Sequence, residues 1–168
     1  PAHETWVLDD GNRLAVAELA RGLGARYLSR AENTDFKAGN LNNALEHIDA
    51  DLVGVIDADH VVEPGFFTNT LGYFDDPGIA AVQTPQDFYN LDSFEHEPRD
   101  LDKPMFNEQA VFYRVILPAK NRWNAVFWCG TSAVLRVAAL RDVGGVATGS
   151  VTEDIHTSIR LHKKGWKI

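Results

Sequence analysis

Apolar positions in the first third of the chain follow two alternating spacings. Residues 16–23 and 41–48 place apolar side chains at the i, i+3, i+4, i+7 spacing of a helix facing a core. Residues 5–8 and 25–29 are short strand candidates, and the near-continuous apolar run 52–56 suits a strand covered on both faces. The pattern predicts a βαβαβ unit, and therefore an α/β domain with a mixed, mostly parallel sheet flanked by helices.

Acidic side chains follow two of these predicted strands. "DDG" begins at Asp9, and "DAD" spans Asp57 to Asp59. Open α/β sheets bind ligands at the carboxyl ends of their strands. In an extended segment, residues i and i+2 point the same way, so Asp57 and Asp59 are expected to present two carboxylates to one point. Such oxygen ligands suit Mg²⁺ or Mn²⁺, with substrate phosphates completing the site.

A simpler interpretation of the same acids is a solvated turn that leads toward Glu63 and Pro64. For a D-x-D taken alone, turn chemistry is the favoured explanation. A phosphohydrolase motif of the form D-x-D-x-T is disfavoured, because Val61 stands where the hydroxyl residue would be.

Charge and composition restrict the partners. The formal net charge is −8 with acids scattered along the chain, which argues against nucleic acid and anionic lipid as electrostatic partners. The single cysteine, Cys129, excludes an internal disulfide and fits a reducing compartment. The longest nearly apolar run, 125–135, is shorter than the roughly 20 residues that a membrane-spanning helix needs. No signal peptide and no zinc-binding pattern are recognisable.

Three later segments have both structural and functional interpretations. "KAGN" is either a helix start or a site where Lys37 and the backbone near Gly39 approach phosphate. "FWCG", with Trp128 at its centre, has the composition of core packing. In "TED", Thr152 suits a helix N-cap, and acids in the first turn complement the helix dipole. Capping accounts for Glu153, whereas Asp154 could also face a cleft.

The order of the motifs points to one family. They are "DDG", "KAGNLN", "DADH", "VQTPQDFYN", "NEQAVFY", "FWCGTSAVLR" and "GGVATGSVTED". Together they resemble the catalytic domain of processive family 2 glycosyltransferases, most closely the bacterial cellulose synthase catalytic subunits. The resemblance covers essentially the whole chain and is far more specific than D-x-D alone.

The resemblance implies a GT-A fold, with residues 1–168 forming a single catalytic domain truncated at both ends. It also implies a UDP-sugar donor, Mg²⁺ or Mn²⁺ as cofactor, and inverting transfer to a growing polysaccharide. The expected reaction is transfer of glucose from UDP-glucose to a β-glucan such as cellulose, and the chain by itself is expected to be inactive. The alternatives are a synthase of an N-acetylglucosamine-containing or β-1,3-linked polymer and a non-catalytic nucleotide-binding relic. A nucleotidyltransferase, which would release pyrophosphate, is a further alternative.

The resemblance also assigns roles to residues. Nucleotide-sugar binding falls to Asp9, at the base, Asp10, which supports the turn, Lys37, near the diphosphate, and Asp57 and Asp59, at the metal and donor sugar. His60 is expected either to complete the metal site or to support it indirectly. Trp128, Cys129 and Gly130 are expected to border the acceptor, and Asp154 is the expected catalytic base. No second carboxylate can be nominated as the nucleophile that a retaining mechanism would need.

Two departures from the family pattern are visible. A first strand and the Q-x-x-R-W motif would lie outside residues 1–168. "TDFKAGN" replaces the His-Ala that commonly precedes the lysine in cellulose synthases, which leaves the product less specified. The family further implies a parent protein with transmembrane helices in the inner membrane and this domain on the cytoplasmic side.

Overall fold

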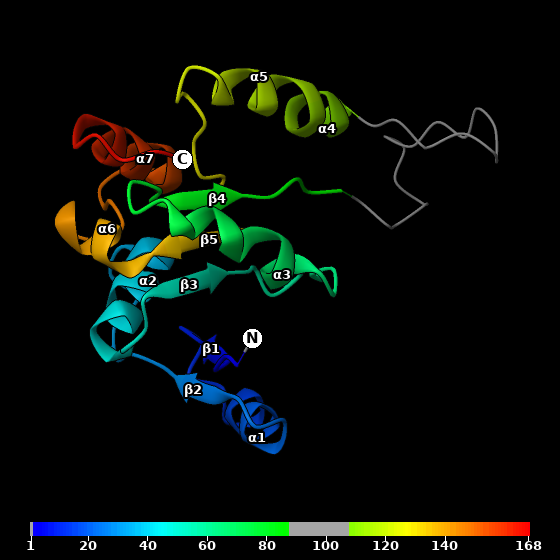
Figure 1. Cartoon of the computed structure of the whole chain (residues 1–168). Coiled ribbons are helices and arrows are strands. Elements are labelled where there is room, and N and C mark those ends of the chain that lie inside the picture. Colours follow the sequence, from blue (N-terminus) through cyan, green and yellow to red (C-terminus); the bar gives the residue numbers. More distant parts are fainter. Residues whose placement is uncertain (1, 88–107) are drawn as a thin grey trace.

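The computed structural model describes residues 2–87 and 108–168 as five short strands, helices and connecting loops (Figure 1). The strands are β1 (Trp6–Leu8), β2 (Arg26–Leu28), β3 (Leu52–Val55), β4 (Ala81–Gln83) and β5 (Ala133–Arg136). The first half contains the helices α1 (Leu14–Gly22), α2 (Phe36–His47), α3 (Phe66–Thr70) and the 3₁₀ turn η1 (Leu71–Asp75). The second half contains α4 (Glu108–Val111), the π-helical η2 (Phe112–Ile116), α5 (Leu117–Asn121), α6 (Val137–Asp142) and α7 (Glu153–Lys163).

The strands form two sheets. β1 and β2 pair in parallel, as the βαβ pattern predicts. The other sheet has the order β3-β5-β4, and its central strand is antiparallel to both neighbours. The mixed α/β class is confirmed, but the parallel share among the described strands is smaller than expected. The cause is the chain reversal before β5, which inserts that strand between two strands running the opposite way.

The register of β5 places its first residue at the edge where the neighbouring strands end. Ala133 is opposite Val55, the last residue of β3, and also opposite Gln83, the last residue of β4. The loop that precedes β5 therefore meets the segments that follow β3 and β4. This edge is where the sequence predicts ligand binding.

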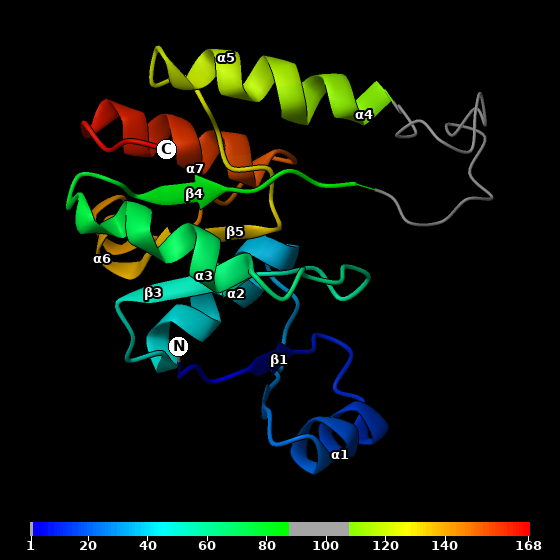
Figure 2. The same ribbon diagram turned by 45° about the vertical axis from the view of Figure 1, so that its right-hand side comes forward.

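Side-chain alternation along the three-stranded sheet creates two cores. Ala133 and Leu135 of β5 face the larger core, which α2, α5, α6 and α7 cover. Val134 faces the smaller core with Phe66 and Phe74 of α3 and η1. Figure 2 shows α3 in front of this sheet and α2 behind it. The period of two along a strand explains why a continuous apolar run is needed here.

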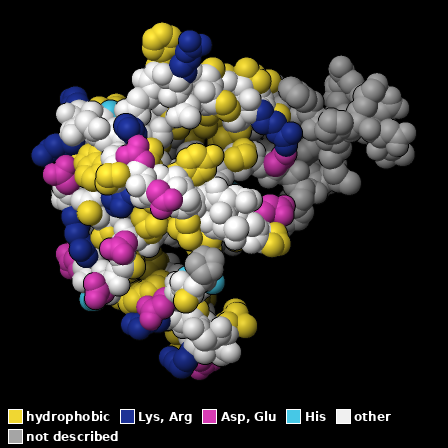
Figure 3. All heavy atoms as spheres, viewed as in Figure 1, with side chains coloured by type: hydrophobic (Ala, Val, Ile, Leu, Met, Phe, Trp, Pro, Cys, Tyr) yellow, Lys and Arg dark blue, Asp and Glu magenta, His cyan; other side chains and the backbone are white. Residues whose placement is uncertain are grey.

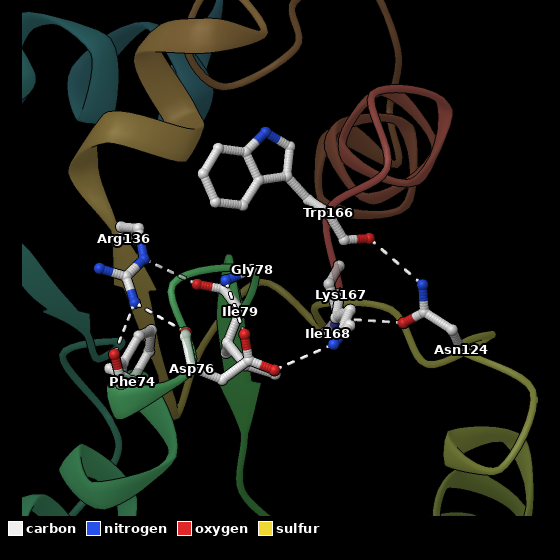
Figure 4. Close-up of polar contacts among 9 residues, drawn as sticks. All are labelled: Phe74, Asp76, Gly78, Ile79, Asn124, Arg136, Trp166, Lys167 and Ile168. Atoms are coloured by element: carbon white, nitrogen blue, oxygen red, sulfur yellow. Dashed lines mark hydrogen bonds and ion pairs between the residues drawn. The ribbon is translucent and has the colours of Figure 1, made fainter.

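The last residues continue the sheet beyond β4. Lys167 pairs with Ile79 in a parallel bridge, and its ammonium lies 2.9 Å from Asp76 Oδ2 (Figure 4). Beside it, Arg136 donates to the carbonyl oxygens of Ile79 and Phe74 at 2.8 Å. The helix α7 and the short segment after Gly165 are thus fixed to the sheet.

The surface has no concentration of acid on the face seen in Figure 3, where acidic and basic side chains alternate. This distribution agrees with a net charge of −8 that is spread along the chain. Within residues 2–87 and 108–168, no helix combines the length and apolar character needed to cross a membrane.

Candidate active site

The segment after β3 carries a lysine–aspartate pair. Lys37, in the first turn of α2, donates from Nζ to Asp57 Oδ1 at 2.5 Å, and each side chain is about one-third exposed. The backbone N–H of Asp57 donates to Thr131 Oγ1 at 2.8 Å, which ties this segment to the loop before β5. The structure therefore brings together Lys37 and Asp57, which the sequence assigns to diphosphate and metal.

Asp59 lies in a turn rather than on an extended strand. β3 ends at Val55, and the His60 N–H donates to the Asp57 carbonyl at 3.0 Å, which closes the turn. The i, i+2 argument from extended geometry is therefore wrong for this segment. Asp59 still reaches solvent at the same sheet edge, with a side chain that is 86% exposed.

His60 supports the turn through the loop before β5. Its Nδ1 lies 3.2 Å from Ser132 Oγ and 3.3 Å from Thr131 Oγ1, and its Nε2 lies 3.9 Å from Asp59 Oδ1. The ring is therefore held by hydroxyls on one side and faces Asp59 on the other. Its assignment as a metal ligand remains a prediction.

The chemistry of this edge fits a hard divalent cation. No group of three Asp, Glu, His or Cys side chains is gathered as a metal cage in the described parts of the chain. Mg²⁺ in nucleotide sites is usually held by one or two carboxylates together with substrate phosphates. Asp57 and Asp59 supply such carboxylates. Because the charge of Asp57 is already paired with Lys37, a bound cation would neutralise the negative charge of Asp59.

The loop before β5 is held from β4. Gln83 Oε1 accepts from the Cys129 N–H at 2.8 Å, and Gln83 Nε2 donates to the Thr131 carbonyl at 3.0 Å. Thr84 Oγ1 donates to the Ser132 carbonyl at 2.7 Å. The sequence marked "VQTPQDFYN" as a motif but gave Gln83 no role, because its partners lie far away in the chain. Positions 88–90 of that motif and Asn107 of "NEQAVFY" lie outside the described residues.

Gly130 lies between the catalytic candidates. Its φ is +79°, and a methyl group built on its Cα would lie 3.2 Å from Asp154 Oδ2 and 3.6 Å from Lys37 Nζ. A side chain here would be strained and would press against both charged groups. Gly130 is thus the point at which the loop before β5, α2 and α7 meet.

Asp154 sits in the first turn of α7 with one oxygen engaged locally. Its Oδ1 accepts from the Ile155 N–H at 2.7 Å, and Oδ2 is the oxygen toward Gly130. The Asp154 carbonyl accepts from Ser158 Oγ at 2.8 Å, and Ser158 Oγ accepts from the Trp128 N–H at 2.9 Å. The proposed base and the "FWCG" loop are therefore linked through one buried hydroxyl.

Thr152 occupies the N-cap position of α7 as predicted, but its side chain makes no capping hydrogen bond. Instead, Ser150 Oγ lies 3.3 Å from Thr152 Oγ1 and accepts from the Thr152 N–H at 3.3 Å. Glu153 and Asp154 are the acids of the first turn. The dipole argument holds for both positions, while the side-chain cap is absent.

The backbone around the site is unusual. Asp35, Phe36 and Ser132 have φ values of 60°, 46° and 52° although none is glycine. Left-handed conformations cost about 1–3 kcal/mol each and concentrate at functional sites. Two of these residues lead into α2 directly before Lys37, and the third contacts His60. The strain therefore coincides with the elements that hold the candidate residues.

Gly39 has a packing role. A methyl group on Gly39 would lie 2.1 Å from the Thr34 carbonyl and 2.5 Å from Arg30 Nη1. Its N–H donates to the Asp35 carbonyl at 3.0 Å. Of the two interpretations of "KAGN", the helix start with close loop packing accounts for this glycine.

The "DDG" turn after β1 is internally bonded. Asp9 is buried and accepts from the backbone N–H groups of Gly11 and Arg13, the Arg13 guanidinium and the Tyr27 hydroxyl. These donors, with the Arg13 side chain foremost, hold the pKa of Asp9 far below its usual range. Asp10 forms a two-point ion pair with Arg30 at 2.7 and 2.8 Å. Asp10 thus ties the turn to Arg30, and the roles of Asp9 and Asp10 in nucleotide-sugar binding remain predictions.

The three residues assigned to the acceptor differ in exposure. Trp128 is completely buried in the larger core, so its ring supports the loop from beneath. Cys129 is half-buried, and burial raises the pKa of its thiol to about 11. Tyr113 lies beside Cys129 in the same cluster of partly buried side chains, and burial also raises the pKa of Tyr113. Tyr113 was not singled out from the sequence, although "NEQAVFY" contains it.

The Cys129 thiol should be unreactive at neutral pH. A pKa of about 11 leaves about 0.1% thiolate at pH 8, and the thiolate is the nucleophile. Alkylation by iodoacetamide, followed by mass spectrometry, should be slow and should accelerate about tenfold per pH unit below pH 11. In denaturant the pKa of the thiol should return to about 8.5, and the thiol should react quickly. Rapid alkylation of the folded protein at pH 7 would contradict this environment.

Comparisons with known proteins give a consistent picture. A family model described as "Glycosyltransferase like family 2" matches residues 1–168. The chain is 41% identical over 164 residues to cellulose synthase 1 catalytic subunit (UDP-forming) of Komagataeibacter xylinus, covering 96% of this chain and 22% of that protein. It is 42% identical over 161 residues to the cellulose synthase catalytic subunit (UDP-forming) of Pseudomonas fluorescens, with 95% and 22% coverage. The chain thus spans about a fifth of the length of these relatives.

A solved structure has the same fold. The mannosyltransferase PcManGT from Pyrobaculum calidifontis, in complex with GDP-Man and Mn²⁺, matches with a TM-score of 0.68 and 23% identity. The match covers 98% of this chain and 44% of that one. The likeness establishes the GT-A fold expected from the sequence.

Proposed function

Since the chain belongs to glycosyltransferase-like family 2, we propose that it forms the catalytic domain of an enzyme that extends a β-glucan such as cellulose with glucose from UDP-glucose. The observation that carries the proposal is the meeting of Lys37, Asp57, Gly130 and Asp154 at one sheet edge. The ammonium, together with a divalent cation held by the carboxylates, can bind a diphosphate, and a separate carboxylate can take up a proton. The similarity to cellulose synthases supports glucose as the sugar that is transferred.

Asp154 is proposed to act as the general base. Its Oδ2 is the oxygen at Gly130, whereas Oδ1 is held by the Ile155 N–H, so the carboxylate has a fixed orientation. As the acceptor hydroxyl attacks the anomeric carbon, its proton passes to Asp154 and the bond to the diphosphate breaks. Attack from the face opposite the leaving group inverts the configuration in one step.

Lys37 is proposed to stabilise the leaving diphosphate. The ammonium is paired with Asp57 and is therefore positioned before donor binds, so it can offset developing negative charge without reorganising. Asp57 and Asp59 would hold Mg²⁺ or Mn²⁺, which supplies further charge neutralisation at the phosphates. We propose Asp9 and Asp10 as the wall of the nucleotide site, and Cys129 and Gly130 as the acceptor border, with the buried Trp128 supporting that loop from beneath.

The surroundings of the domain follow from the same family. We propose that residues 1–168 belong to one catalytic domain, on the cytoplasmic side of the inner membrane, in a parent protein with transmembrane helices. The support is the similarity to catalytic subunits of which the chain covers 22%.

The test is donor profiling of the full-length protein in membrane vesicles. UDP-glucose should give UDP and a polymer that linkage analysis identifies as β-1,4-glucan. Incorporation of N-acetylglucosamine instead would correct the donor. Release of pyrophosphate would indicate a nucleotidyltransferase, and UDP binding with no turnover would indicate a non-catalytic relic; either result would overturn the proposal.

A further inference from the structure

The side chain of Asn42 joins α2 to the loop before α7. Its Nδ2 donates to the Val146 carbonyl at 2.8 Å, and its Oδ1 accepts from the Val146 N–H at 2.7 Å. The amide thus pairs with both backbone groups of one residue that is 104 positions away in the sequence. Asn42 is half-buried and Val146 is buried, so water competes poorly for these bonds.

The loop backbone is shaped around this contact. Gly145 has a φ of +87°, and a methyl group on it would lie 2.5 Å from Asn42 Oδ1. Any side chain at this position would be strained and would displace the amide. The glycine and the asparagine therefore form one fitted contact, which we call the Asn42 latch.

The contact continues into the first turn of α7. The Ala147 N–H donates to Thr157 Oγ1 at 2.9 Å, and Thr157 Oγ1 donates to the Glu153 carbonyl at 2.6 Å. Thr157 and Ala147 are both completely buried. The loop that Asn42 holds is therefore fixed to the backbone directly before Asp154.

The helix that carries Asn42 also carries Lys37. Lys37 lies in the first turn of α2, and Asn42 lies farther along the same helix. One rigid element therefore holds the ammonium at one point and the support of α7 at another. Misplacement of a catalytic group by about 1 Å can cost about 100-fold in rate, so such a connection has functional consequences.

We infer that Asn42 is a positioning residue that fixes the first turn of α7, and with it Asp154, relative to Lys37. The inference rests on the proposed function for the role of Asp154. Asn42 itself does not touch the substrates: it acts through Val146, Ala147 and Thr157.

The first test measures kinetics in the full-length protein. Asn42→Ala should lower kcat about 10- to 100-fold, while the Kd for UDP changes by less than about threefold, since Lys37 and Asp57 keep their contact. Asn43→Ala is the matched control, because it removes a neighbouring amide whose buried Nδ2 has no hydrogen-bond partner among the described residues. Equal kcat values for the two variants at matched melting temperatures would overturn the inference.

The second test needs no sugar transfer. Hydrogen exchange of the full-length protein should show faster exchange over residues 144–149 and the first turn of α7 in Asn42→Ala but not in Asn43→Ala. If Asn42→Ala does not accumulate in folded form, Asn42→Asp keeps an oxygen for the Val146 N–H and loses the donor to its carbonyl. Unchanged exchange in this segment would overturn the latch. Lack of transfer by the wild-type protein would instead overturn the proposed function, so the two failures are distinguishable.

Discussion

Asp154→Asn in the full-length enzyme should fold and bind UDP but lose about 10² to 10⁴ in turnover, the usual contribution of a general base. The structure supports this separation of effects. An amide oxygen can still accept from the Ile155 N–H, and the Ser158 bond goes to the Asp154 backbone carbonyl, which the substitution keeps. What is lost is the basic oxygen at Gly130.

Glu153→Gln is the matched control, since it removes one negative charge from the same helical turn. The loss of a favourable helix-dipole charge costs about 0.3–1 kcal/mol of stability, and both variants should show it. UDP release measured beside melting temperatures tests the assignment. If Asp154→Asn turns over at a near-normal rate, or loses activity only in proportion to stability, Asp154 is a helix-start residue and the base lies elsewhere.

The first third of the fold was predictable because its information is local. The apolar spacing at 16–23 and 41–48 predicts helices that the structure places at Leu14–Gly22 and Phe36–His47. The predicted run 52–56 matches β3, which ends at Val55. The local pattern located both helices, but it did not determine the buried face of α1, where Leu19 and Leu23 of the predicted stripe are 63% and 77% exposed and the buried residues are Ala17 and Ala20.

The arrangement of the second half was not predictable in the same way. The apolar run 125–135 contains both a loop and the first part of β5, and its length and composition do not distinguish them. The antiparallel insertion of β5 depends on pairing with Val53 and Val82, which are distant in sequence. The roles of Gln83 and Asn42 depend on partners 46 and 104 residues away, so local patterns could not reveal them.

The candidate site shows both outcomes. The motifs identified Lys37, Asp57, Gly130 and Asp154, and the structure brings these four together. For Asp59 the residue was selected through extended geometry that the structure replaces with a turn. The turn leaves Asp57 paired with Lys37 and Asp59 exposed, so the two acids are not equivalent. A substitution at Asp59 therefore tests metal binding without also breaking the ion pair with Lys37.

Asp59→Asn should abolish the metal dependence of UDP binding. In the wild-type protein, calorimetry should show UDP binding that requires Mn²⁺ or Mg²⁺ and disappears with chelator. The amide supplies no charge for a hard cation, so the affinity for UDP in the presence of metal should fall. Loss of a residue that only supports a metal ligand costs about 10- to 100-fold, and loss of a ligand itself should cost at least as much. Asp57→Asn would also break the pair with Lys37, whereas among the described residues the one ion-pair partner of the Asp59 carboxylate is His60, at 3.9 Å.

Glu63→Gln controls for net charge, since it removes an exposed acid four residues beyond Asp59. It should leave metal-dependent UDP affinity within about threefold, because charges exposed to solvent are well screened. The contrast between the two variants separates coordination from general electrostatic attraction of the cation. Equal UDP affinity of the wild-type protein with and without chelator would remove the metal from the mechanism. Stabilisation of the negative charge on the leaving diphosphate would then depend on Lys37 and on the helix N-termini beside Lys37.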